Sequence, residues 1–109
     1  MRQHFLRRLV TDYGYPTSLI GVEVPIRVGD APKRLDAVVM HDDMQPALII
    51  EFKRETIALT QKVLDQASVY NRAMHVPYLI LSNGPQTIVA RVLDEGYEFL
   101  DTIPTWNQF

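Results

Sequence analysis

Two carboxylates and one ammonium group stand at the ends of strongly apolar segments of the sequence. Glu51 and Lys53 follow the apolar run 47–50, and Asp36 interrupts the apolar run 35–40. Side chains two positions apart on a strand share a face, so Glu51 and Lys53 would point the same way. Carboxylate oxygens hold Mg²⁺, which activates water and offsets charge on phosphorus. A lysine beside them can orient or deprotonate that water. These residue types therefore suit hydrolysis of a phosphodiester bond.

The relation between Asp36 and Glu51 depends on a predicted β-hairpin. Strands over 34–40 and 46–53 are joined by a short polar loop and would lie about 4.8 Å apart. With residues 42 and 43 at the tip, Asp36 lies opposite residue 49, two positions from Glu51. A stagger or a bulge would align the two carboxylates.

The rest of the chain predicts the elements that surround this hairpin. Hydrophobic periodicity and turn residues place them in the order αβββαββ: a helix near 5–13, a strand over 20–28, the hairpin, a helix from the cap Thr60 to about Met74, and strands over 78–81 and 87–93. Short loops make the first three strands antiparallel, and the second helix permits a parallel crossover. The expected fold class is α/β (α+β), a mixed sheet of about five strands flanked by helices.

Two of these elements have predicted faces. In the strand over 20–28, Val22, Val24, Ile26 and Val28 would share one face, and Glu23 and Arg27 the other. In the second helix, the predicted buried face comprises Val63, Ala67, Tyr70 and Met74.

Composition limits the classes of protein to consider. The chain has 109 residues, which predicts a single domain over 1–109. Its net charge of −2 argues against coating of nucleic acid by bulk charge. The absence of cysteine excludes disulfide frameworks and thiol nucleophiles. The longest apolar run is far shorter than the roughly 20 residues of a membrane span, and no secretory signal is recognisable, which predicts a cytoplasmic protein without a membrane partner.

Simpler roles for the charged residues stay open at this point. Glu51 and Lys53 could form a surface ion pair, worth less than about 1 kcal/mol. Asp36, inside an apolar strand, needs a partner or a metal, and a salt bridge to Arg34 or Lys53 would supply one. These ordinary structural roles require no catalysis.

Five separate pieces of the sequence together resemble a known family. In order, they are Lys33-Arg34-Leu-Asp36, Leu48-Ile-Ile-Glu51-Phe-Lys53, Gln66-x-x-x-Tyr70, Pro77-Tyr-Leu-Ile80 and Asn83-Gly84. They resemble the PD-(D/E)xK nuclease superfamily, and in particular the N-terminal nuclease domain of type I restriction enzyme R subunits. Leu35 stands where the name of the superfamily has proline. The resemblance implies a restriction-endonuclease-like sandwich.

The resemblance also implies roles for individual residues. Asp36 and Glu51 match the metal-binding carboxylates, Lys53 matches the catalytic lysine, and the backbone carbonyl of Phe52 would be a further metal ligand. Glu23 is a candidate additional ligand; its alternative is an ion pair with Arg27 or Lys33. The implied cofactor is Mg²⁺, for which Mn²⁺ can substitute.

Further residues are expected around this centre. Gln66 and Tyr70 match the Gln-x-x-x-Tyr motif of one branch of the superfamily, and their spacing of four places them on one helical face. Alternatively, Tyr70 is a core aromatic and Gln66 a solvated side chain. Four basic residues could contact DNA phosphates: Arg2, Arg34, Arg54 and Lys62.

The expected function is Mg²⁺-dependent hydrolysis of DNA phosphodiester bonds by an endonuclease-type domain. The alternative is a non-catalytic DNA-binding or assembly module that retains the nuclease fold. The chain has no Gly-rich Walker loop, so motor activity would come from a larger restriction complex. A homodimer that places two sites on one duplex is compatible with both hypotheses.

Overall fold

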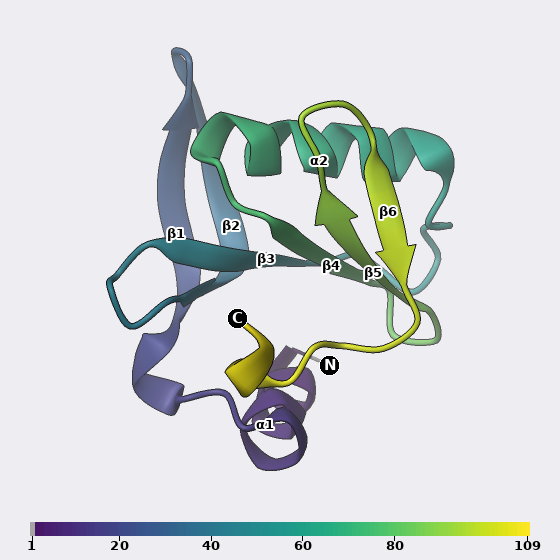
Figure 1. The fold of residues 1–109 in the computed structure, drawn as a ribbon. Coiled ribbons are helices and arrows are strands. Elements are labelled where there is room, and N and C mark those ends of the chain that lie inside the picture. Colours follow the sequence, from purple (N-terminus) through teal and green to yellow (C-terminus); the bar gives the residue numbers. More distant parts are fainter. Residues whose placement is uncertain (1) are drawn as a thin grey trace.

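The β-sheet contains six strands that follow one another in space in their order along the chain (Figure 1). The structure, a computed structural model, describes residues 2–109. The helices are α1 (Arg2–Tyr13) and α2 (Gln61–Met74), and short 3₁₀ turns cover Thr17–Leu19 and Trp106–Gln108. The strands are β1 (Ile20–Val28), β2 (Ala31–Met40), β3 (Pro46–Phe52), β4 (Tyr78–Ser82), β5 (Thr87–Val92) and β6 (Tyr97–Leu100).

The strand pairing confirms the predicted mixed α+β sandwich and adds one strand to it. All neighbouring strands are antiparallel except β3 and β4, which are parallel and joined through α2. The sixth strand, β6, pairs with β5 at an edge of the sheet. The expected count of about five strands is therefore one too low.

The bounds of α2 follow from local capping. The Thr60 side chain accepts a hydrogen bond from the backbone N–H of Val63, which satisfies a free donor of the first turn. His75 ends the helix in the left-handed conformation, with φ 57°, and Pro77 follows. These bounds confirm the predicted helix. No helix within residues 2–109 has both the length and the apolar character needed to cross a membrane.

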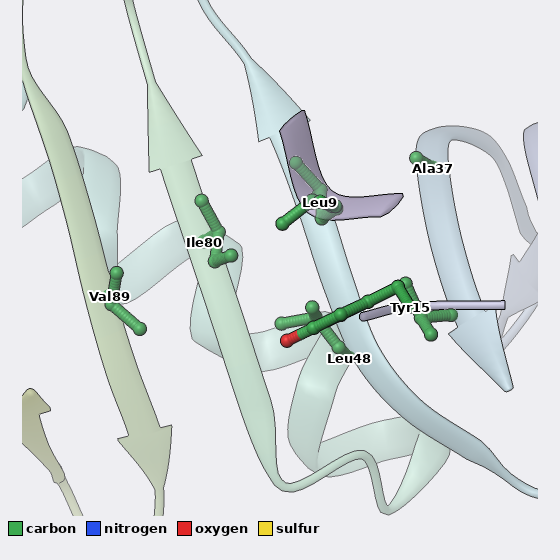
Figure 2. Packing of buried hydrophobic residues seen from close by; sticks show 8 residues of the cluster. Leu9, Tyr15, Ala37, Leu48, Ile80 and Val89 are labelled. Carbon is green, nitrogen blue, oxygen red and sulfur yellow. The ribbon is translucent and has the colours of Figure 1, made fainter. Parts of the chain in front are cut away.

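One face of the sheet packs against α1 and the C-terminal segment. Figure 2 shows this core, in which the buried cluster comprises Leu9, Tyr15, Ala37, Val39, Leu48, Ile50, Ile80 and Val89. The Tyr15 hydroxyl donates a hydrogen bond of 2.8 Å to the carbonyl of Pro104, which fixes the C-terminal segment to this core. Burial raises the pKa of the Tyr15 hydroxyl well above its usual range.

The other face of the sheet packs against α2. Its buried cluster comprises Leu35, Val38, Ile49, Leu64, Ala67, Val76, Leu79 and Leu81. The predicted buried face of the helix is partly wrong, because the fully buried residues of α2 are Leu64, Ala67, Ser68 and Asn71. The donor groups of the two polar members have hydrogen-bond partners: Ser68 donates to the Asp65 carbonyl, and Asn71 donates to the carbonyls of Val76 and Tyr78. Among the described residues, the buried side-chain oxygen of Asn71 has no partner.

The alternation of faces breaks in the middle of β1 and β2. Leu35 packs on the α2 side, whereas Ala37, two residues later, packs on the α1 side. The β1–β2 pairs 22–37 and 24–35 flank Glu23, which has the unusual φ of 51°. A left-handed residue inside a strand redirects the side chains that follow it. The predicted common face of β1 is therefore wrong for one residue: Val24, Ile26 and Val28 lie on the α2 side, whereas Val22, before the break, is exposed.

Candidate active site

The register between β2 and β3 contains the stagger needed to align the two candidate carboxylates. Ala37 lies opposite Ile50, and the register shifts by one residue between Val39 and Met40. Continuing the pairing by one position beyond Ala37 places Asp36 opposite Glu51. The register shift near the hairpin loop therefore determines which residues lie opposite each other at the other end of the two strands.

Asp36 sits where the β2–β3 ladder stops. Its Oδ2 accepts a hydrogen bond of 2.7 Å from the backbone N–H of Phe52. The side chain therefore takes the donor that the next backbone pair would have used, and it lies at the peptide that joins Glu51 to Phe52. Within residues 2–109, Asp36 has no ion pair with Arg34 or Lys53. The alternative of a salt bridge is therefore wrong, because the backbone N–H of Phe52 pairs with the carboxylate instead.

Glu51 is a buried carboxylate held between two lysines. The residue is only 5% exposed. Its Oε1 lies 3.2 Å from Nζ of Lys33, and its Oε2 lies 3.8 Å from Nζ of Lys53. A buried charge is costly unless it is paired, so these two cations explain how the end of β3 tolerates an acid. The alternative of a decorative surface pair between Glu51 and Lys53 does not describe this arrangement.

Lys33 joins the site to α2. Its Nζ lies 4.7 Å from the centre of the Tyr70 ring, within the range of a cation–π contact. Tyr70 is half-buried. Because its ring contacts Lys33, it helps to position the lysine that pairs with Glu51. The alternative that Tyr70 is only a core aromatic does not account for the contact of its ring with the Lys33 ammonium group.

Glu51, Lys53 and Tyr70 line one cavity of about 460 Å³ between the sheet and α2. Gln66 also lines it and is exposed. Lys33 completes the polar part of the wall. The structure therefore brings the two helix residues of the predicted motif to the same space as the carboxylate and the lysine.

Sequence reasoning did not select Lys33 as a site residue. In an unbroken strand, Lys33 and Asp36 would lie on opposite faces because they are an odd number of positions apart. The break at Glu23 and Asp36 places Lys33 with Leu35 on the α2 side instead. The lone available signal was its position three residues before Asp36, which does not predict this contact.

Glu23 is not part of the carboxylate pair. It forms an ion pair of 3.6 Å with Arg2, not with Arg27 or Lys33. Among the described residues, no three acidic, histidine or cysteine side chains gather closely enough to hold a metal ion. The candidate role of Glu23 as an additional metal ligand therefore stays a prediction, and its left-handed backbone is its evident structural contribution.

The four basic residues predicted to contact DNA differ in exposure and in ion pairing. Arg34, Arg54 and Lys62 are exposed. Arg2 is partly exposed, and its guanidinium group is engaged with Glu23. Three of the four cations are therefore exposed at the molecular surface.

The donor set at the end of β3 fits a hard divalent cation. Asp36, Glu51 and the Phe52 carbonyl offer oxygen atoms alone, and Mg²⁺ prefers oxygen and retains several water ligands. Two carboxylates and a carbonyl leave room for those waters. The hydrogen bond from the Phe52 N–H fixes the Asp36 carboxylate at the peptide between Glu51 and Phe52.

The fold and the site together define an α+β sandwich with an acidic and lysine-rich centre at the ends of two adjacent strands. Residues 1–104 match the family described as the type I restriction enzyme R protein N terminus (HSDR_N), and the chain belongs to this family. The predicted resemblance to the R-subunit N terminus is confirmed. Membership of the PD-(D/E)xK superfamily stays a prediction.

A solved structure has the same fold. It is a fragment assigned to the HsdR subunit of a type I restriction enzyme from Vibrio vulnificus YJ016, with a TM-score of 0.64 and 18% identity. The match covers 92% of this chain and 22% of that chain. This chain thus corresponds to less than a quarter of that fragment. No match was found among curated proteins.

Proposed function

We propose that this chain is a Mg²⁺-dependent nuclease domain that hydrolyses DNA phosphodiester bonds in a restriction system. The observation that carries the proposal is the end of β3, where Asp36 is held at the Glu51–Phe52 peptide and Glu51 is buried between two lysines. The family described as the type I restriction enzyme R protein N terminus supports the restriction context.

The chemistry divides among a few groups. Asp36, Glu51 and the Phe52 carbonyl would hold Mg²⁺, which when bound lowers the pKa of water and offsets negative charge at phosphorus. Lys53 orients the attacking water through its ammonium group. The water oxygen bonds to phosphorus and releases its proton to solvent while the bond to the 3′ oxygen breaks. That oxygen takes up a proton from solvent, which leaves a 5′-phosphate and a 3′-hydroxyl. Gln66 and Tyr70 support the wall of the cavity.

The partners follow from charge and size. Arg34, Arg54 and Lys62 are exposed and available to DNA phosphates. The matched HsdR fragment is several times longer than this chain. We therefore propose that other parts of a restriction complex supply motor activity and sequence specificity, and that the domain acts in the cytoplasm.

Cleavage of supercoiled plasmid with Mg²⁺ or Mn²⁺ tests this function. We expect the wild-type chain to nick or linearise the plasmid, and Lys53→Ala and Asp36→Ala to lose at least about a hundredfold in rate, in line with loss of acid–base or electrostatic assistance. Asp94→Ala removes an exposed carboxylate and serves as the matched control. Equal activity in the wild type and both site variants would refute the assignment.

One observation favours the non-catalytic alternative. Both oxygens of Glu51 already face lysines, so the buried carboxylate is satisfied without a metal. Calorimetry with Mn²⁺ separates the two functions. A functional centre binds Mn²⁺ and loses that binding in Glu51→Ala, whereas a DNA-binding or assembly module shows no difference between the two proteins.

A further inference from the structure

The β1–β2 hairpin is a two-stranded ribbon at its outer end. β2 pairs with β1 along residues 31–39, but with β3 only from Ala37 onward. The part of the hairpin before Ala37 therefore has no third strand beside it. In Figure 1 its tip projects past the sheet, far from α1.

One face of this ribbon carries two arginines and two prolines. Pro25 lies opposite Arg34, and Arg27 lies opposite Pro32. Residues directly opposite, or two apart on one strand, share a face, so all four side chains lie together, and all four are exposed. They line a shallow depression at the surface. The two guanidinium groups flank a surface of rigid apolar rings.

The opposite face of the same ribbon belongs to the candidate active site. Val28, Ala31 and Lys33 line the cavity that contains Glu51 and Lys53. The ribbon is therefore a thin wall between the proposed catalytic cavity and the arginine face. A polymer bound in the cavity would pass beside this wall.

The ribbon differs in charge from the rest of the molecule. Residues 25–34 contain three basic residues, Arg27, Lys33 and Arg34, and one acid, Asp30, whereas the whole chain has a net charge of −2. The backbone carbonyl of Asp30 accepts a hydrogen bond of 3.1 Å from Arg27, which holds this guanidinium near the tip. Because Lys33 faces the cavity and pairs with Glu51, the arginine face has Arg27 and Arg34 against Asp30, and this local net charge of +1 on an acidic protein is complementary to a phosphate backbone.

We propose that the β1–β2 hairpin enters the major groove of duplex DNA, with Arg27 and Arg34 bound to phosphates across the groove from the cavity. The major groove, about 12 Å wide, admits a two-stranded ribbon. Guanidinium groups bind phosphate oxygens in a bidentate manner. The proposal rests on the proposed function and deepens it: it names the element that holds the duplex beside the cavity.

The test is binding of the wild-type chain and of Arg27→Ala/Arg34→Ala to a fluorescent duplex of about 30 base pairs, measured by anisotropy across a salt series with EDTA. Each phosphate contact contributes about −0.9 to the slope of log K against log salt. We expect the double variant to reduce the magnitude of the slope by about 1.8. If the two proteins bind equally at 1 M salt, this difference in slope makes the affinity of the double variant roughly 18-fold lower than that of the wild type near 0.2 M salt.

A charge-matched variant controls for general electrostatics. Arg7→Ala/Arg8→Ala removes two exposed cations from α1, which lies away from the hairpin tip (Figure 1). It changes net charge by the same amount, and we expect little effect on affinity or slope. An equal loss in both double variants would overturn the proposal.

Two further substrates test the groove itself. In a duplex with glucosylated hydroxymethylcytosine, the glucose groups fill the major groove. We expect the wild type to bind this duplex more weakly than the unmodified duplex, and Arg27→Ala/Arg34→Ala to bind the two duplexes with nearly equal affinity. Single-stranded DNA should be bound with a slope that the hairpin substitutions leave unchanged. If the hairpin variant loses as much affinity for single-stranded DNA as for duplex DNA, groove entry is wrong. It is also wrong if the hairpin binds an acidic protein but does not bind the duplex.

The outcomes separate this proposal from the proposed function. Arginine-dependent duplex binding without any plasmid cleavage supports the hairpin and refutes the nuclease. Plasmid cleavage with binding that is indifferent to Arg27 and Arg34 supports the nuclease and refutes the hairpin.

Discussion

Replacement of Lys33 by methionine tests the energetic basis of the site. Lys33→Met retains the length and much of the apolar stem that packs near Tyr70, but it removes the cation 3.2 Å from Glu51. Lys53 remains as a partner at 3.8 Å, too far for a strong hydrogen bond. The variant therefore leaves one oxygen of a buried carboxylate without its direct donor.

The magnitude follows from burial. Removing one partner of a fully buried ion pair costs about 3–5 kcal/mol, and a hydrogen bond to a charged group contributes about 1.5–3 kcal/mol. The Glu51 side chain is 7% exposed, but that of Lys33 is 26% exposed, which screens the pair and favours the lower range. We expect a loss of about 2 kcal/mol in the free energy of unfolding, or roughly 10 °C in Tm.

Urea denaturation of four proteins measures this interaction. The wild type, Lys33→Met, Glu51→Gln and the double variant form a double-mutant cycle, and the expected coupling free energy is about 1.5–2 kcal/mol. Lys62→Met on the exposed start of α2 is the control, with an expected change within about 0.5 kcal/mol. Additive effects in the cycle, or equal losses in Lys33→Met and the control, would refute the reasoning.

Two further predictions concern stability. Asn71→Ala removes buried donors to two backbone carbonyls, and we expect a loss of about 2–3 kcal/mol by urea denaturation; an unchanged midpoint would contradict the role of Asn71 as the link between α2 and β4. Tyr15→Phe loses about 1 kcal/mol near pH 7. Burial raises the pKa of Tyr15, so its contribution to the free energy of unfolding is present below the unfolded pKa of about 10 and is lost as pH rises above that value. Over this alkaline range we expect the free energy of unfolding to fall less in Tyr15→Phe than in the wild type. Parallel curves of unfolding free energy against pH would contradict this.

The regular elements were predictable because their signals are local. The alternation over 20–28 and the cap at Thr60 both depend on neighbouring residues, and the structure confirms those bounds. β6 was missing from the predicted order because Tyr97–Leu100 is short and has only one strand to pair with. Its formation depends on β5, a tertiary contact that a four-residue pattern does not indicate.

The site was predictable only in part, for a related reason. The types and order of Asp36, Glu51 and Lys53 indicated the chemistry, but their alignment depends on a register shift between Val39 and Met40. The contact between Lys33 and Glu51 depends on the left-handed backbone of Glu23 in a neighbouring strand. Since Glu23 is not glycine, nothing in its type predicts that conformation.

A crystal structure of the chain soaked in Mn²⁺ tests the central claim most directly, because the anomalous signal locates the ion. We predict one ion bound by the carboxylates of Asp36 and Glu51 and by the Phe52 carbonyl, at about 2.0–2.2 Å as expected for a small octahedral cation. Absence of an ion there, with Lys33 still paired to Glu51, would contradict the account.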